Sequence, residues 1–588
     1  MFNLKSSSKL SATLLALILG ASVFMAGQVW AAKYVTDPSN GKVYSAPQYG
    51  GTLTHTTQYN YVGSIDTIDY HIGGFIVSGV LEKLTIADWA IDRDEYPFVG
   101  GYQLPTYAMR GALAESWEQP DPLTIIFKMR KGVYWHNKAP MNGRELTAKD
   151  VEYTFHRMLG LGSGFTEPST APGQLQTLPF ESITATDKYT VVFKLKEPYL
   201  TAPIHIQDSN ISFIYPPEVI EQYGGMKDWR NLVGTGPFML TDRVEGSSWT
   251  WTKNPDYWGH DAKFPENRLP YIDELRMLII PEEETRVAAI RSGHIDFIGW
   301  QGFSPIKNID LAERLKQTNP ELVMYPWAER SENAFALNTS RPPFDDVRVR
   351  KAMQMALDLE TMNATFFKGL GDPIPKGTVG MPGYFIPYDE WPQEVKDGFA
   401  YNPEGVEKLL DEAGYPRGSD GIRFTVTLHY GGDVGYKELS AAYWSDIGVD
   451  VKLKMTTGTE HHALVRERSH DMITTVLGIK ADPFYTVSFA HSEDVDNKPA
   501  VNDPVYDAMY EAGEDATSFE QLKEMIIEMD MYAIERFWRI WGPEVPVFTV
   551  AQPWVTGYSG EGGMGGMQTQ TIFARLWIDS QLKEAMGH

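Results

Sequence analysis

Alternation of apolar and polar residues predicts strands in two similar segments of the chain. Residues 124–130 (TIIFKMR) and 190–196 (TVVFKLK) each place every second apolar side chain on one face. A period of two is typical of a strand that is buried on one side. Because the two segments share this pattern, we expect them to lie in one antiparallel sheet. The residues on the buried faces are Ile125, Phe127, Met129, Val191, Phe193 and Leu195.

Other segments carry apolar residues at the spacing of an amphipathic helix. Thr147 precedes such a segment and is followed three residues later by Asp150, the arrangement of a capping box. Asn402 and Pro403 form a second start signal, because proline is favoured in the first turn of a helix. Further helices are expected at 283–291, after a capping Asp345, and over a methionine-rich segment at 522–538.

The segment from Val233 to Gly259 (VGTGPFMLTDRVEGSSWTWTKNPDYWG) predicts an aromatic hairpin. It opens with Gly-Thr-Gly-Pro at 234–237, a tight turn that needs small residues and a fixed φ. A short apolar strand follows, and alternating Trp and Thr residues at 249–252 form its partner across a loop at 245–248. A turn sequence at 254–256 and two large rings close the segment.

The N-terminal residues predict a secretory signal peptide. Lys5 and Lys9 precede a mostly apolar run at 10–25, and Val29-Trp30-Ala31 has the small or modest residues of a cleavage site. We expect cleavage after Ala31. The alternative is an uncleaved membrane anchor, but the apolar run is shorter than the roughly 20 residues that a spanning helix needs.

Composition narrows the class of protein. A chain of 588 residues is too long for one hydrophobic core, so two or more domains are expected. The absence of cysteine excludes disulfides, thiolate chemistry and a lipid-anchored cysteine. A net charge of −25 disfavours binding to nucleic acid or to anionic lipid. These features are typical of a soluble, monomeric protein of the periplasm.

The motifs GTGPF and NPDYWG resemble the signature of the peptide/nickel-type family of extracellular solute-binding proteins. This family comprises the periplasmic receptors of ABC importers, such as the dipeptide- and oligopeptide-binding proteins. Residues 113–158, 282–298 and 333–358 are similar to further motifs of the family in the same order. The resemblance therefore spans nearly all of the mature chain.

The resemblance implies a two-lobed α/β periplasmic-binding-protein fold of three domains, with the ligand in a cleft between hinge-linked lobes. Two crossovers are expected, near Leu278–Pro281 and near the end of the methionine-rich helix. The first lobe combines a discontinuous domain and an inserted one. The expected division is a signal peptide at 1–31, domain I at 46–70, 181–281 and 530–588, domain II at 71–180, and domain III at 282–529.

The resemblance also implies a ligand-binding aspartate. In peptide-binding members, a Gly-Trp-x-x-Asp segment supplies a carboxylate for the α-ammonium group of the ligand, and residues 478–482 (GIKAD) keep this spacing. Asp482 is therefore a candidate for that role. Ile479 replaces the aromatic residue and Pro483 follows directly, so a structural aspartate in a turn before proline is the alternative. Lys480 is placed to neutralise Asp482 or to favour an anionic or uncharged ligand.

Three more residues are expected at the ligand site. Trp300 and Trp327 are candidates for stacking against sugars or aromatic side chains, with core packing as the alternative. Asn338 is a further candidate for ligand binding. Neither a cofactor nor a metal is expected. The cluster of Glu460, His461 and His462 with His470 matches no zinc spacing, and His136 and His156 are interpreted as packed or solvated.

We therefore predict a binding protein that delivers a peptide-like solute to an inner-membrane ABC permease by hinge closure. The same fold also serves oligosaccharides, chelated nickel, haem and opines, and it serves receptors that only signal. A secreted hydrolase is the alternative from another class. The sequence contains no HExxH or GxSxG motif, which disfavours that alternative.

Overall fold

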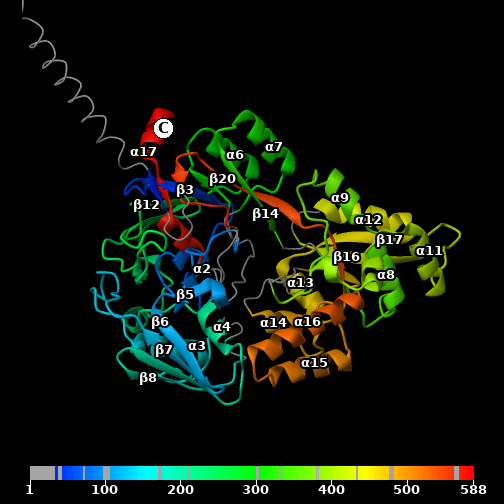
Figure 1. Cartoon of the computed structure of the whole chain (residues 1–588), viewed down its shortest axis with the longest axis horizontal. Helices are drawn as coiled ribbons and strands as arrows, with labels where there is room; N and C mark the ends of the chain where they lie inside the picture. The colour runs from blue at the N-terminus through cyan, green and yellow to red at the C-terminus, as the bar shows by residue number, and fades with distance from the viewer. Residues whose placement is uncertain are drawn as a thin grey trace, which may run out of the picture.

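A computed structural model gives the fold of the protein. It describes residues 34–36, 43–61, 63–69, 73–93, 95–96, 98, 106–169, 175, 178–208, 211–299, 304–329, 334–378, 381, 383–431, 435–475, 482–561 and 568–588. The predicted signal peptide lies outside these residues. In the part of the chain described, none of the helices is both long and apolar enough to cross a bilayer. Figure 1 shows two lobes, with the chain passing between them.

A seven-stranded mixed sheet forms the centre of the first lobe. Its order is β10 (Phe238–Val244), β11 (Ser248–Lys253), β12 (Glu274–Ile279), β3 (Thr52–Thr57), β13 (Phe297–Ile298), β20 (Val545–Ala551) and β14 (Val323–Glu329). Helices α6 (Glu283–Arg291) and α7 (Ile309–Thr318) pack beside β13 and β20. Short pairs β4 (Thr85–Ala87) with β5 (Met109–Gly111) and β21 (Val555–Thr556) with β22 (Trp577–Ile578) complete this lobe.

The predicted aromatic hairpin is confirmed as β10 and β11. Its Gly-Thr-Gly-Pro turn lies so close to the chain at Val80 that a Cβ atom on Gly234 would be 1.8 Å from the Val80 carbonyl oxygen. The Gly236 N–H donates to that same oxygen at 2.8 Å. Asn254 returns to the turn and donates its side-chain amide to Gly236 O at 3.0 Å. The glycines are therefore required by backbone-to-backbone contact.

A four-stranded antiparallel sheet lies beside the first sheet. Its order is β6 (Ala114–Asp121), β7 (Thr124–Met129), β9 (Thr190–Leu195) and β8 (Phe180–Asp187). The register pairs Ile125 with Phe193 and Phe127 with Val191, which confirms the predicted sheet. Helix α3 (Ala148–Leu159) covers it, and the predicted capping box of Thr147 and Asp150 is present.

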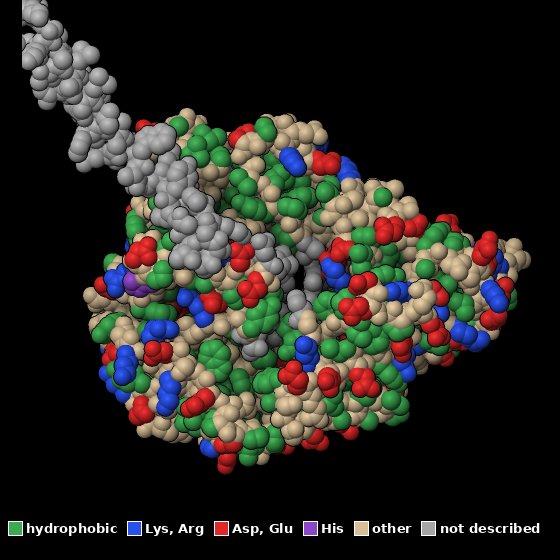
Figure 2. All heavy atoms as spheres, viewed as in Figure 1, with side chains coloured by type: hydrophobic (Ala, Val, Ile, Leu, Met, Phe, Trp, Pro, Cys, Tyr) green, Lys and Arg blue, Asp and Glu red, His purple; other side chains and the backbone are tan. Residues whose placement is uncertain are grey.

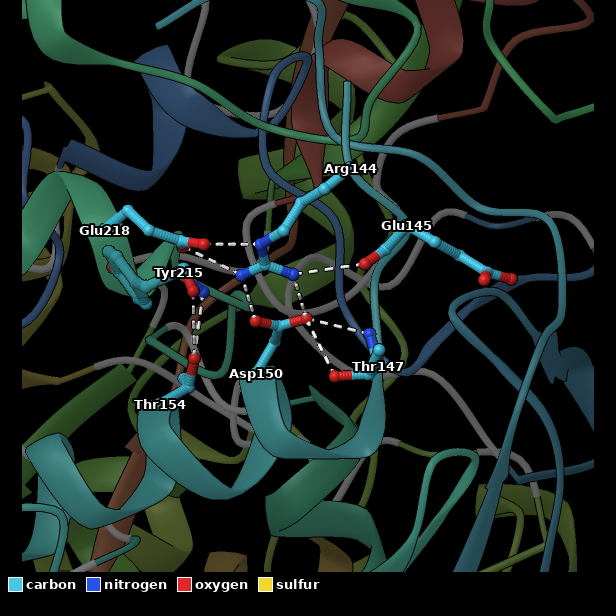
Figure 3. Close-up of polar contacts among 7 residues, drawn as sticks. All are labelled: Arg144, Glu145, Thr147, Asp150, Thr154, Tyr215 and Glu218. Carbon is cyan, nitrogen blue, oxygen red and sulfur yellow. Dashed lines mark hydrogen bonds and ion pairs between the residues drawn. The ribbon is translucent and has the colours of Figure 1, made fainter. Parts of the chain in front are cut away.

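Arg144 ties helix α3 to helix α5 (Pro217–Tyr223), as Figure 3 shows. Its guanidinium donates to both oxygens of Asp150 and to both oxygens of Glu218, at 2.5–3.0 Å. The Asp150 carboxylate also accepts the Thr147 N–H at 2.8 Å. One arginine therefore fixes the start of α3 and joins it to a segment about 70 residues away.

The second lobe is built on a five-stranded sheet. Its order is β17 (Val449–Met455), β16 (Phe424–Tyr430), β18 (Met472–Thr475), β15 (Ala334–Leu337) and β19 (Arg539–Trp541). Its longer helices are α8 (Val347–Met355), α9 (Leu359–Thr365), α11 (Pro403–Glu412), α12 (Gly435–Asp446), α13 (Gly458–Arg466), α15 (Pro504–Glu514) and α16 (Phe519–Glu535). The helix predicted after Asn402 is confirmed. The cap predicted at Asp345 is instead Asp346, which accepts the Arg348 N–H.

The strand pairings correct three predicted domain boundaries. β8 and β9 lie after residue 180 but pair with β7, so the inserted domain reaches the end of β9. β13 and β14 lie after residue 282 but belong to the first sheet. α16 and β19 continue past residue 530 within the second lobe. The chain therefore crosses between lobes after Glu329 and after Trp541, and not at Leu278–Pro281.

The histidines singled out by sequence are packed into the scaffold. His136 is buried, its Nε2 lies 3.0 Å from Gly236 O, and burial lowers its pKa to about 4. The His156 ring contacts Ser163 and Ile183 O. His470 is buried, with Nε2 at 2.7 Å from Lys498 O, and burial lowers its pKa. The ring nitrogens of these three histidines therefore form hydrogen bonds with backbone groups and with one hydroxyl.

Candidate ligand site between the lobes

The two lobes meet where helix α4 (Ala202–Asp208) faces the short helix α14 (Pro483–Val487), near the centre of Figure 1. Asp482, from the second lobe, accepts a hydrogen bond from the Thr201 hydroxyl at 2.6 Å. The Nε2 atom of His205 lies 2.7 Å from the same carboxylate oxygen. Both partners belong to the first lobe, so one carboxylate links the two lobes.

Local chemistry explains the position of Asp482. It is the N-cap of α14, and its other oxygen accepts the Phe484 N–H at 2.8 Å. Pro483 occupies the first helical position, where a missing N–H costs nothing. Asp482 is fully buried, and three donors surround its two oxygens. Such saturation is what a buried carboxylate requires.

Tyrosines surround this carboxylate. The pKa of Tyr199 and that of Tyr510 are raised by burial and then by the negative charge of Asp482. The pKa of Tyr384 is raised for the same two reasons. The ring of Tyr485 lies edge-on to His205, with centroids 6.2 Å apart. The junction is therefore an aromatic and polar surface with neutral tyrosines at physiological pH.

The lobes also touch near the crossovers. Lys368, in the second lobe, forms ion pairs with Asp310 and Glu313 of α7, the latter at 2.6 Å. These side chains are partly to largely exposed, so each pair contributes little stability in water. The strong polar contact between the lobes is therefore at Asp482, far along the chain from the hinge.

The other predicted site residues have different surroundings. Trp327 lies on edge strand β14, half-buried, and its indole N–H donates to Thr549 at 3.1 Å. Asn338 is fully buried; its amide donates to the carbonyls of Arg468 and His470, and its oxygen accepts from Ser340. This geometry favours a structural role for Asn338. Lys480 and Trp300 lie outside the described residues.

Sequence reasoning missed Thr201 and His205. They lie 281 and 277 residues before Asp482, so no local pattern connects them. The segment Ala-Pro-Ile-His-Ile-Gln-Asp at 202–208 has the composition of an ordinary short helix. Only the packing of the lobes shows that its histidine meets an acid.

Two lobes that are joined by two crossovers and linked by a buried polar contact are typical of a hinged solute-binding protein. The sequence agrees with this class: residues 108–497 match the model of the bacterial extracellular solute-binding proteins, family 5. The chain belongs to this family, whose members are binding proteins and not enzymes.

Known proteins support the assignment. Heme-binding protein A of Haemophilus influenzae is 28% identical over 58% of this chain and 60% of its own length. The periplasmic oligopeptide-binding protein OppA of Escherichia coli is 26% identical over 77% of both chains. The structure of NikA from Brucella suis in complex with Fe(III)-EDTA covers 90% of this chain and 100% of that one, with a TM-score of 0.70 and 23% identity.

Proposed function

We propose that this chain is the periplasmic receptor of an ABC importer, which captures a peptide-like solute between its lobes and delivers it to the permease. The observation that carries the proposal is the cross-lobe contact of Asp482 with Thr201 and His205. A ligand that touches both lobes shifts the population toward the closed state, because only that state offers both sets of contacts. The receptor acts as a monomer.

Export is part of the proposal. The N-terminal 31 residues act as a signal peptide that is removed after Ala31, which places the protein in the periplasm. The test is the intact mass of protein recovered from the periplasm of an expressing host. A mass that corresponds to a chain starting at Ala32 supports the proposal. Recovery of the uncleaved chain in the inner membrane contradicts it.

A peptide is the ligand that the site favours. When the lobes separate, Asp482 loses Thr201 and His205 and can offer its carboxylate to the ligand ammonium, and the neighbouring tyrosines offer hydroxyls and ring faces. The alternative ligand is an oligosaccharide, because the half-buried Trp327 leaves part of a ring available for stacking. Native mass spectrometry of protein purified without denaturation identifies a retained ligand by its mass and separates the two.

The role of Asp482 is tested by Asp482→Asn and His205→Gln side by side. If Asp482 is the counter-charge of the ligand ammonium, Asp482→Asn costs about 3–5 kcal/mol, a loss of peptide affinity of a hundredfold or more. His205→Gln then has a small effect. If Asp482 acts only by holding the lobes together, both variants weaken binding of any ligand to a similar extent. Wild-type affinity in both variants would assign Asp482 to the scaffold.

A further inference from the structure

A cavity of about 800 Å³ is lined by residues of the first lobe only. It is formed where the β4–β5 hairpin, the end of β7, the turn after β11 and the segment Thr569–Arg575 come together. None of the residues that form the junction around Asp482 lines it. Its volume is in the range of cavities that hold small organic ligands.

Arg575 is buried at the wall of this cavity, with 7% of the residue exposed. Its guanidinium lies 4.4 Å from the centre of the Trp89 ring. It makes no hydrogen bond or ion pair to any residue that the structure describes, and its Nε is fully buried. Burial lowers the pKa of Arg575 to about 10; the charge of Asp261 and that of Glu561 raise it, whereas those of Arg93 and Arg110 lower it. A buried cation that forms no ion pair within the described residues is costly.

Arg110, at the centre of β5, is a second cation of the same kind. Its Nε is buried without a partner, and the side chain makes no hydrogen bond within the described residues. Arg130 provides the contrast. It lines the same cavity, but its guanidinium donates to Ala112 O at 2.9 Å and lies over the ring of Trp258 at 4.8 Å. Arg130 therefore has a structural role, whereas the guanidinium N–H groups of Arg110 and Arg575 are available to bind a ligand.

Within the described residues, none of the acids that line the cavity forms an ion pair with Arg110 or Arg575, although the charge of Asp261 acts on Arg575. Glu82 accepts from Thr235, Tyr257 and Trp258. Asp261 accepts from the Tyr271 hydroxyl and from two backbone N–H groups. Glu115 is exposed at the rim and forms no ion pair in the described part of the chain.

We propose that this cavity binds a small organic anion whose carboxylate or phosphate group is held by Arg110 and Arg575. Guanidinium groups bind both anions through paired, charge-assisted hydrogen bonds. The ring of Trp89 and the apolar side chains of Ile86 and Leu269 line the same cavity and provide contact for the body of the ligand. This site is separate from the solute site between the lobes.

The test uses citrate and inorganic phosphate as probes on the full-length mature protein. Thermal unfolding is measured at constant ionic strength against sodium chloride, and affinities are measured by calorimetry. We expect one probe or both to raise the Tm above the chloride value, and the stronger probe distinguishes a carboxylate from a phosphate site. Arg575→Gln and Arg110→Gln should each weaken that binding at least tenfold.

Arg276→Gln is the matched control, because Arg276 is an exposed arginine of β12 in the same lobe. It should bind the probes as the wild type does. Circular dichroism verifies that each variant is folded. If Arg575→Gln does not fold, the probe affinity of Arg110→Gln alone tests the proposal. The proposal is overturned if neither probe stabilises the wild type beyond chloride, or if both arginine variants bind as tightly as Arg276→Gln. Solute binding between the lobes should be unchanged in the folded variants.

Discussion

At the scale of single residues, Glu82 is where both ends of the aromatic hairpin meet. Its carboxylate accepts from Thr235 of the Gly-Thr-Gly-Pro turn and from Tyr257 and Trp258 of the closing turn, at 2.8–2.9 Å. Burial raises the pKa of Glu82 to about 7, although these three donors oppose the shift. The two motifs that resemble the family signature are thus joined by one buried acid.

The raised pKa of Glu82 predicts a pH dependence of stability. The folded chain keeps the proton up to about pH 7, whereas the unfolded chain releases it near pH 4.5. The folded state therefore binds more protons in this window, and the free energy of unfolding falls as the pH rises through it. The expected loss is about 2–4 kcal/mol.

Chemical denaturation of wild type and Glu82→Gln between pH 4.5 and 8 measures this effect. The glutamine amide is isosteric with the glutamate side chain and stays neutral at every pH. The fall in the free energy of unfolding that is due to Glu82 should therefore be absent in the variant. The difference between the two curves removes the contribution of all other titrating groups. Parallel curves for the two proteins would show that Glu82 does not titrate in this window.

Arg144 allows a second prediction at this scale. Arg144→Met leaves the buried Asp150 carboxylate without its bidentate partner (Figure 3). Because Arg144 itself is one-third exposed, we expect a destabilisation of about 2 kcal/mol, below that of a fully buried pair. Urea unfolding measures it. Arg276→Gln, which breaks an exposed pair with Glu274, should cost less than about 1 kcal/mol.

Little of the candidate site was accessible from sequence. The resemblance selected Asp482, but its partners Thr201 and His205 are far away in the chain and lie in the other lobe. Asn338 was selected as a site residue, yet its amide is used by backbone carbonyls. Arg575 and Arg110 carry no motif, because their significance depends on which side chains of the folded, described residues lie near them.

At the scale of elements, we expect the Gly-Thr-Gly-Pro turn to be sensitive to any side chain larger than glycine at Gly234. In Gly234→Ala, the new methyl group overlaps the Val80 carbonyl, which is backbone and cannot rotate away. The turn must shift, and the hairpin and the Glu82 contacts shift with it. We expect a destabilisation of about 3 kcal/mol, at the upper end for overpacking.

Gly458→Ala is the control for this prediction. Gly458 begins helix α13 and has no atom within 4 Å of the position that a Cβ would take. Alanine should therefore be neutral or slightly stabilising there. Both variants are compared by thermal and urea unfolding. A Gly234→Ala protein as stable as Gly458→Ala contradicts the contact argument.

Local elements were predictable, but their membership in sheets was not. The β10–β11 hairpin, the β7–β9 pair, α6 and the start of α11 follow from alternation, helical spacing and caps. β13 has only two residues, and it joins the first sheet by pairing with β3 and β20, each about 240 or more residues away. No periodicity in the sequence encodes such a partner.

At the scale of the whole molecule, the contact at Asp482 predicts how readily the lobes separate. Asp482→Asn and His205→Gln weaken the polar link across the cleft, so the ligand-free population should shift toward an open form. Small-angle scattering should show a larger radius of gyration than for the wild type. Asp450→Asn, at an exposed ion pair on β17, is the control. An unchanged radius in both variants would falsify a latch role.

Acidic side chains are spread over both lobes in Figure 2, with lysines and arginines between them. On this face, the acidic residues behind the net charge of −25 are not confined to one lobe. Such a surface keeps copies of the protein apart and favours the monomer. Light scattering at physiological salt should give the mass of a monomer at every protein concentration. That mass should lie slightly below the 66.2 kDa of the full chain, because the proposed signal peptide has been removed.

The strand order of the first sheet has a consequence for biosynthesis. β3 is made among the first 60 residues, but β20, which lies between β13 and β14, is made only after residue 544. The four strands of the inserted domain all lie within residues 114–195, so they can pair early. The first lobe, in contrast, stays incomplete until the ribosome has nearly finished. A chain whose first lobe cannot fold early stays unfolded for longer, which would suit the export through a translocation pore that we propose for this protein.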